Sequence, residues 1–96
     1  MRFLSWKFSL VLICILVVSA CGGLAQKKAE QAADHMNMGI AYIESGNYPA
    51  ALKELLEAEK FTPDNPKLHY YLGIAYVCNE LTEKAVTEFN TAVSLK

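Results

Sequence analysis

The sequence has no excess of basic residues. Nine Lys and Arg stand against ten Asp and Glu, and the formal net charge is −1. A protein that binds a nucleic acid backbone needs a basic stripe or patch to displace the counterions around the phosphates. None is found along this chain, so we expect no nucleic acid partner.

No alternating apolar and polar run in the sequence indicates a strand. Cysteine is also scarce. The three cysteines are Cys14, Cys21 and Cys78. Cys14 lies in an apolar N-terminal run and Cys21 at its end, which leaves Cys78 alone in the body of the chain and excludes an internal disulfide there. We interpret Cys78 as a small apolar helix residue and not as a reactive thiol, since no cationic residue lies beside it in sequence to stabilise a thiolate.

The groups that an enzyme needs do not converge anywhere in the sequence. Glu54, Glu57 and Glu59 lie beside Lys53 and Lys60 on one predicted helix, which is typical of a solvated face. The segment SGN is too short for a phosphate-binding loop. We therefore predict no enzyme activity, no cofactor, no metal and no small-molecule substrate.

The N-terminus has the plan of an export signal. Arg2 and Lys7 precede the apolar run Phe8 to Val18, and small residues follow. The segment VSACGG resembles a bacterial lipobox, which implies cleavage before Cys21 and lipidation of its thiol. Residues 1–20 are then a signal peptide and residues 21–33 the lipidated cysteine and a tether, which Gly22 and Gly23 make flexible.

This resemblance places the rest of the chain at the membrane, facing the periplasm. Gly22 after the cysteine favours the outer membrane. The alternatives are a plain cleaved signal or an uncleaved membrane helix, because about 18 apolar residues can span a bilayer. Loss of Arg2 and Lys7 leaves seven basic and ten acidic residues, so the formal charge falls from −1 to −3.

The body of the chain is internally repeated. HMNMGIAY, which begins at His35, returns as HYYLGIAY, which begins at His69, and 69 − 35 gives a period of 34 residues. A period of this length indicates stacked structural units. Repeat 1 covers about residues 32–65 and repeat 2 about residues 66–96, within a domain of residues 34–96.

Each repeat has the signals of two helices and a turn. In repeat 1 the turn ESGNYP separates them, Pro49 lies in the first turn of the second helix, and that helix ends near Phe61 before TPDNP. In repeat 2 the helices are expected at residues 67–79 and 82–95. Thr82 is expected to cap the last helix.

These residues resemble the tetratricopeptide repeat. The signature positions of the two units are occupied by Met38, Gly39, Tyr42, Ala51, Leu55, Ala58 and Pro63, and by Leu72, Gly73, Tyr76, Ala85, Phe89 and Ala92. The resemblance implies an all-α fold with four antiparallel helices in an α-solenoid. Three or more repeats are normal for such arrays, and the closing proline of repeat 2 would fall at position 97, so repeat 2 is expected to be incomplete. Either the gene stops early or the chain is a fragment of a longer array.

The same resemblance implies a concave groove lined by the first helix of each repeat. The positions that match are Ala33, Met36, Ile40, Ile43 and Glu44, then Lys67, Tyr70, Ile74, Val77 and Cys78. Only Lys67 matches the residues of members that clamp a peptide carboxylate, so apolar anchoring by Met36, Ile40, Ile43, Tyr70, Ile74 and Val77 is the better prediction. The alternative is that these side chains pack against further repeats or the tether. His35 and His69 occupy equivalent positions, which we interpret as packing positions between helices.

A lipobox followed by such repeats is similar to the pilotin lipoproteins of type IV pilus biogenesis, which help secretin subunits to reach the outer membrane and assemble. Those proteins carry more repeats, so the similarity covers their N-terminal portion. We expect a membrane-anchored protein-interaction scaffold whose partner is a secretin or another envelope-assembly factor. The alternatives are a docking subunit of a peptidoglycan enzyme and a truncated product without independent activity.

Overall fold

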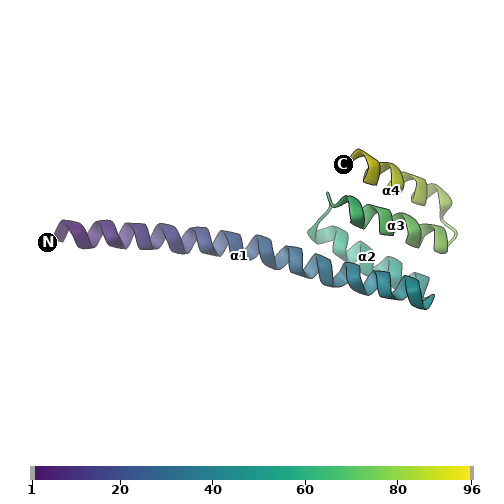
Figure 1. Ribbon diagram of the computed structural model, residues 1–96, viewed down its shortest axis with the longest axis horizontal. Coiled ribbons are helices and arrows are strands. Elements are labelled where there is room, and N and C mark those ends of the chain that lie inside the picture. Colours follow the sequence, from purple (N-terminus) through teal and green to yellow (C-terminus); the bar gives the residue numbers. More distant parts are fainter. Residues whose placement is uncertain (1, 96) are drawn as a thin grey trace.

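The computed structural model describes residues 2–95, with side chains for residues 9–14 and 23–95. The described chain is helical and contains no strand. Its helices are α1 (Arg2–Ser45), α2 (Tyr48–Phe61), α3 (Pro66–Cys78) and α4 (Thr82–Ser94). Successive helices run antiparallel and stack in chain order, with the C-terminus on the side away from α1 (Figure 1). The all-α expectation is confirmed.

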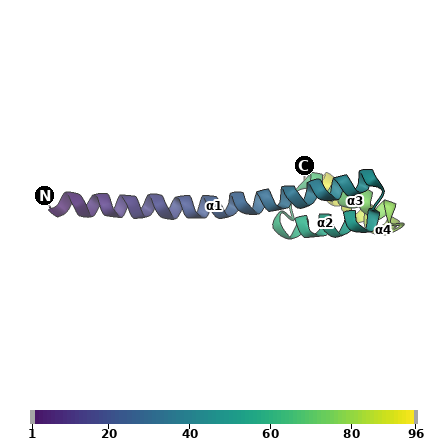
Figure 2. The same cartoon turned by 90° about the horizontal axis from the view of Figure 1, so that it is seen from below.

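Helix α1 is far longer than the others, and most of it projects away from them (Figure 2). The chain measures 71 Å along its longest axis because of this projection. The described side chains before Ala32 are exposed, and Ala32, at 4% exposure, is the first buried one. Within the described part of the chain, no helix combines the length and the apolarity needed to cross a bilayer.

The predicted leader and tether both lie within α1. The helix continues through Gly22 and Gly23, where a flexible segment was expected. Glycine costs about 1 kcal/mol in a helix, but the Ala, Gln, Lys and Glu residues that follow are good helix formers. No break in the backbone marks a boundary at residue 20 or 33, and the division into signal peptide and tether stays a prediction.

The two helical hairpins have the same turn. Asn47 N–H donates to the Tyr42 carbonyl (2.9 Å), and 34 residues later Leu81 N–H donates to the Tyr76 carbonyl (2.8 Å). The turn needs a left-handed residue, which is Gly46 in repeat 1 (φ 82°) and Glu80 in repeat 2 (φ 63°). Glycine adopts this conformation without steric cost, whereas Glu80 adopts it under strain.

The boundaries of α2, α3 and α4 lie within one residue of those expected, whereas α1 begins at Arg2, far before the expected start of repeat 1. Pro49 is in the first turn of α2, and Pro66 begins α3, where the Asn65 side chain accepts a hydrogen bond from Lys67 N–H (3.0 Å). The prediction that Thr82 caps the last helix was wrong. Thr82 is the first residue of α4, and Leu81 precedes it with no side-chain cap, because the repeated turn fixes the start of the helix.

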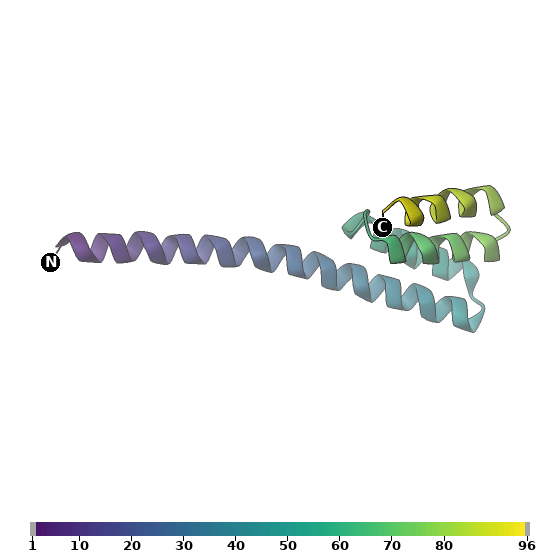
Figure 3. The same cartoon turned by 45° about the horizontal axis from the view of Figure 1, so that its top comes forward.

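The core lies between the two hairpins, where α3 packs on α2 (Figure 3). Its fully buried members come from both repeats and are Leu55, Ala58, Leu68, Leu72 and Ala75. Within each hairpin, a glycine lets the helices approach closely. A Cβ on Gly39 would lie 2.6 Å from Leu55, and one on Gly73 would lie 2.5 Å from Phe89.

Candidate protein-interaction site

Helix α3 carries three of the six predicted groove residues on one face. Tyr70, Ile74 and Val77 are separated by four and three residues, a spacing that aligns side chains along a helix. Tyr70 is 51% exposed, Val77 is 50% exposed and Ile74 is half-buried. An apolar stripe with this exposure is available to a partner.

The equivalent residues of α1 are more covered. Met36 and Ile43 pack against the core between the repeats, and Ile40 is half-buried. Met36 and Ile43 therefore take part in the packing between the two repeats of this chain, whereas packing against further repeats or the tether stays a prediction. The accessible part of the predicted groove therefore lies mainly on α3. Ile40 has in repeat 1 the position that Ile74 has in repeat 2.

An open pocket lies at the end of the α3–α4 hairpin. Its volume is about 330 Å³, and it is lined by Pro66, Lys67, Tyr70, Phe89, Ala92 and Val93. Tyr70 thus belongs both to the predicted groove and to this pocket. No signal in the sequence indicated that residues of α3 and α4 line a pocket there.

The two histidines make the same contact in each repeat. His35 Nδ1 lies 2.7 Å from Glu54 Oε2, and His69 Nδ1 lies 2.6 Å from Glu88 Oε2. Both pairs join the two helices of one hairpin, and both span 19 residues. That shared spacing is the signal by which the pairs could have been found in the sequence.

The prediction of a solvated glutamate face on α2 was therefore wrong for one of its three members. Glu54 is only 20% exposed because it pairs with His35. Glu57 and Glu59 are more exposed, at 39% and 35%; Glu57 pairs with Lys60 at 2.8 Å, and Glu59 lies 3.8 Å from His69.

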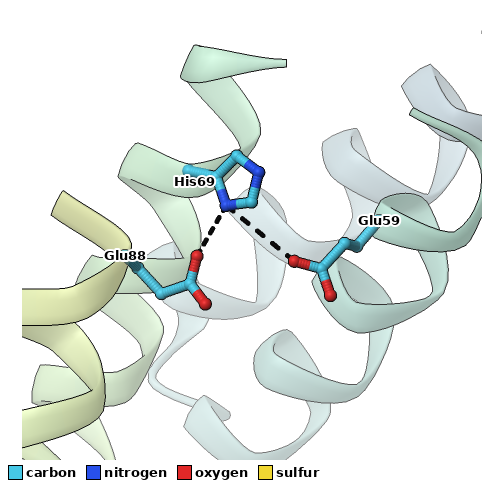
Figure 4. A group of neighbouring side chains, drawn as sticks. All are labelled: Glu59, His69 and Glu88. Carbon is cyan, nitrogen blue, oxygen red and sulfur yellow. Dashed lines mark hydrogen bonds and ion pairs between the residues drawn. The ribbon is translucent and has the colours of Figure 1, made fainter. Parts of the chain in front are cut away.

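His69 connects the two repeats, as Figure 4 shows for its carboxylate partners. Its Nδ1–H donates to Glu88 of α4, with Glu59 of α2 on the same side, and its Nε2–H donates to the Pro63 carbonyl in the turn between the repeats. Because both ring nitrogens face acceptors, the geometry requires the doubly protonated imidazolium. The ring is buried, with 6% exposure.

The charge balance around His69 favours the same form. Burial opposes the charged ring, but the hydrogen bonds to Glu88 and the Pro63 carbonyl, together with the negative charge of Glu88 and Glu59, raise the pKa of His69 above its ordinary value of 6.5. Burial and these two carboxylates likewise raise the pKa of the Tyr76 hydroxyl.

Glu59, His69 and Glu88 could in principle hold a cation, because one ligand atom from each lies within 4.8 Å of the others. A metal would have to displace the Nδ1 proton, since an imidazolium has no free lone pair. The repeated His35–Glu54 pair shows that the same contact forms without a third carboxylate. The arrangement is that of an ion pair that joins helices.

Two cysteines singled out in the sequence take no part in these ion pairs. Cys78, at the end of α3, is a free and half-buried thiol. The side chain of Cys21, the predicted lipidation site, lies outside the described residues.

Comparison with known proteins agrees with the geometry. Residues 39–79, from the last turns of α1 to the end of α3, match a family model described as TPR repeat. A search of curated proteins found no match. Residues 32–95 thus form two stacked helical hairpins, an all-α arrangement similar to tetratricopeptide repeats, and such repeats are generally protein-interaction modules.

Proposed function

We propose that the chain is a membrane-anchored scaffold that binds a segment of a partner protein along the apolar face of α3 and the adjoining part of α1. The observation that supports this function is the stripe of Tyr70, Ile74 and Val77, since two of these large apolar side chains are half exposed on a helix whose opposite face is buried in the core. Contiguous exposed apolar surface commonly marks a binding site.

The composition of the face indicates what it binds. Lys67 is the one basic residue at the matched positions, which is too little to hold a peptide carboxylate by paired charges. Apolar side chains spaced along a helix instead suit a partner segment that inserts apolar anchors of its own. An extended or helical segment of a secretin or another envelope-assembly factor is the partner that we propose.

The proposed anchor is a lipid on Cys21. The segment VSAC at residues 18–21 supports it. From Cys21 to Met36 there are 15 residues, which at 1.5 Å per residue make about 22 Å of helix. Such a helix would hold the binding face at this distance from the membrane. Two or more acyl chains are needed for durable anchoring.

The binding face is tested by Ile40→Glu combined with Ile74→Glu. We expect this double variant to lose the secretin that co-purifies with the lipidated protein, as identified by mass spectrometry, with unchanged helicity by circular dichroism. Thr87→Glu, at an exposed position on α4, is the matched control. Undiminished recovery of the partner by the double variant would contradict the binding face, and recovery of a peptidoglycan enzyme instead would redirect the proposal to a docking subunit.

The anchor is tested independently by Cys21→Ser. We expect the precursor to stay unprocessed and to incorporate no radiolabelled fatty acid, because the acceptor thiol is gone. Cys14→Ser is the control and should leave labelling unchanged. Continued labelling of the Cys21→Ser protein would refute the lipidation site.

A further inference from the structure

His69 lies at the junction of the two repeats and contacts both. It belongs to α3, and its Nδ1–H donates to Glu88 of α4, within repeat 2, at 2.6 Å. Its Nε2–H donates to the Pro63 carbonyl, in the turn that leads from α2 to α3. Glu59 of α2 lies 3.8 Å from Nδ1, which Figure 4 shows between one carboxylate from each repeat.

This arrangement needs two ring protons. A carbonyl and a carboxylate only accept hydrogen bonds, and a neutral imidazole carries one N–H. When the ring loses a proton to water, one of the two acceptors therefore faces a lone pair. The remaining proton stays on Nδ1, because a hydrogen bond to the charged Glu88 is stronger than one to the neutral Pro63 carbonyl. The contact that is lost is the one between Nε2 and the turn.

The turn is the part that moves when this contact is lost. Pro63 and Asp64 are exposed, whereas His69 is 6% exposed and follows the fully buried Leu68. Displacement of the turn relieves the repulsion between the Nε2 lone pair and the carbonyl oxygen, which then binds water. Because the chain passes from repeat 1 to repeat 2 through this turn, its displacement changes how the two hairpins are oriented.

The orientation of the hairpins sets the shape of the proposed groove. Ile40 lies on α1 and Ile74 on α3, so each repeat contributes one of them. Helix α3 packs mainly on α2 and touches α1 little. The distance between the two isoleucines therefore depends on how the hairpin of α3 and α4 is held against α2.

His35 provides the internal comparison. Its Nδ1 lies 2.7 Å from Glu54, and its ring stacks on Phe61 with the centroids 6.0 Å apart, both within repeat 1. Among residues 23–95, no acceptor is hydrogen-bonded to its Nε2. A neutral His35 keeps its bond to Glu54, so its titration breaks no contact between the repeats.

We propose that His69 is a pH-dependent link between the repeats. The imidazolium joins α4 to the turn at Pro63, and loss of the Nε2 proton frees the turn and lets the two hairpins change their relative orientation. The effect on binding rests on the proposed function: the protonated link keeps the groove in the shape that binds the partner, and the neutral ring weakens this binding.

The groups around the ring set the pH at which the link opens. Burial lowers the pKa of His69, but the hydrogen bonds to Glu88 and the Pro63 carbonyl, with the charges of Glu88 and Glu59, raise it above 6.5. Tyr76 of α3 lies near the same two carboxylates, and its own pKa is raised above 10.0, so its hydroxyl stays neutral below that pH. The link is closed below pH 6.5 and opens as the pH rises through the raised pKa of His69.

The test follows the ring and the repeats in one protein. The full chain is prepared in detergent micelles with all its cysteines changed to serine, so that lipidation plays no part. Nitrogen NMR of isotope-labelled histidine reports the protonation of each ring nitrogen. Spin labels at Lys53→Cys on α2 and Thr87→Cys on α4, both exposed positions, report the distance between the repeats by double electron–electron resonance.

We expect Nε2 of His69 to lose its proton while Nδ1 keeps its own, and the label distance to change with the same midpoint pH. Glu59→Gln should move both midpoints to lower pH, because it removes a carboxylate that favours the imidazolium while leaving both hydrogen bonds of the ring in place. His69→Gln should abolish the pH dependence of the label distance, and His35→Gln, the matched control, should leave it unchanged.

Three results would overturn the link. One is an Nε2 that keeps its proton when the ring becomes neutral, and another is a constant label distance while His69 titrates. The third is a pH response of the distance that persists in the His69→Gln protein.

The effect on binding has its own measurement. Recovery of the secretin with the lipidated wild-type protein should fall between about pH 5.5 and about pH 9. Equal recovery at both pH values, alongside a label distance that changes, would overturn the effect on binding. Recovery at neither pH, alongside the same change in distance, would contradict the proposed function and still support the link.

Discussion

Repeat 1 and repeat 2 are copies of one unit, yet their surfaces differ. Leu55 is fully buried in repeat 1, whereas its counterpart Phe89 is partly exposed in repeat 2. Met36 packs in the core, whereas Tyr70 is 51% exposed. The difference shows that burial at these positions depends on which hairpin lies next to the residue, whereas Ala51 and Ala85, which face the inside of their own hairpins, are buried in both repeats.

The largest expected effect is on the free energy of unfolding and comes from the core between the two repeats. Leu55→Ala should lower the free energy of unfolding by about 3 kcal/mol, because it leaves a cavity between the repeats. Phe89→Ala should cost about half as much, since part of its ring is already in water. Urea unfolding of residues 22–96, followed by circular dichroism, measures both. An equal loss of unfolding free energy in the two variants would contradict the difference in burial between Leu55 and Phe89.

The histidines provide the second comparison. His69→Gln should cost about 2 kcal/mol, because it removes charged hydrogen bonds that join α3 to α4 and to the turn between the repeats. His35→Gln should cost less, as His35 pairs with Glu54 alone and is more exposed. The same urea experiment applies. A larger loss for His35→Gln would refute the role of His69 in joining the repeats.

The stability of the pair of repeats should also depend on pH. The pKa of His69 is raised above 6.5 in the folded protein, so the folded state binds the proton more tightly than the unfolded state. The stabilisation is complete below pH 6.5 and is lost as the pH rises through the raised pKa of His69. Thermal melting between pH 5.5 and pH 9 should show this decline, and His69→Gln should remove it. A decline that persists in that variant would assign it to other groups.

The smallest expected effect is in the turns. Glu80→Gly should stabilise the protein by up to about 1 kcal/mol, because glycine adopts the left-handed conformation without strain. Gly46→Ala, at the equivalent position of repeat 1, is the matched change in the opposite direction and should destabilise by a similar amount. Thermal melting compares the two, and destabilisation by Glu80→Gly would show that the left-handed turn is not strained.

Prediction from sequence succeeded where the information was local. The turn at Gly46 and the prolines at positions 49 and 66, together with the repeat period, located α2, α3 and α4 within a residue, because turn residues and prolines act on the backbone next to them. The start of α1 at Arg2 was not predicted. The glutamate partners of the histidines were missed. They lie 19 residues away, on the other helix of each hairpin, and only the packing of that hairpin brings them together.

The sequence by itself determined the repeated helical hairpin, since helix propensity, turn chemistry and apolar spacing are properties of neighbouring residues. Only the tertiary structure decided which copy of each residue is buried. Stacking covers Leu55 and Ala58 and leaves Phe89 and Ala92 at an open pocket, and it encloses His69 between two carboxylates and a carbonyl. The physical reason is that burial and charge pairing depend on distances between helices, which a repeating pattern does not record.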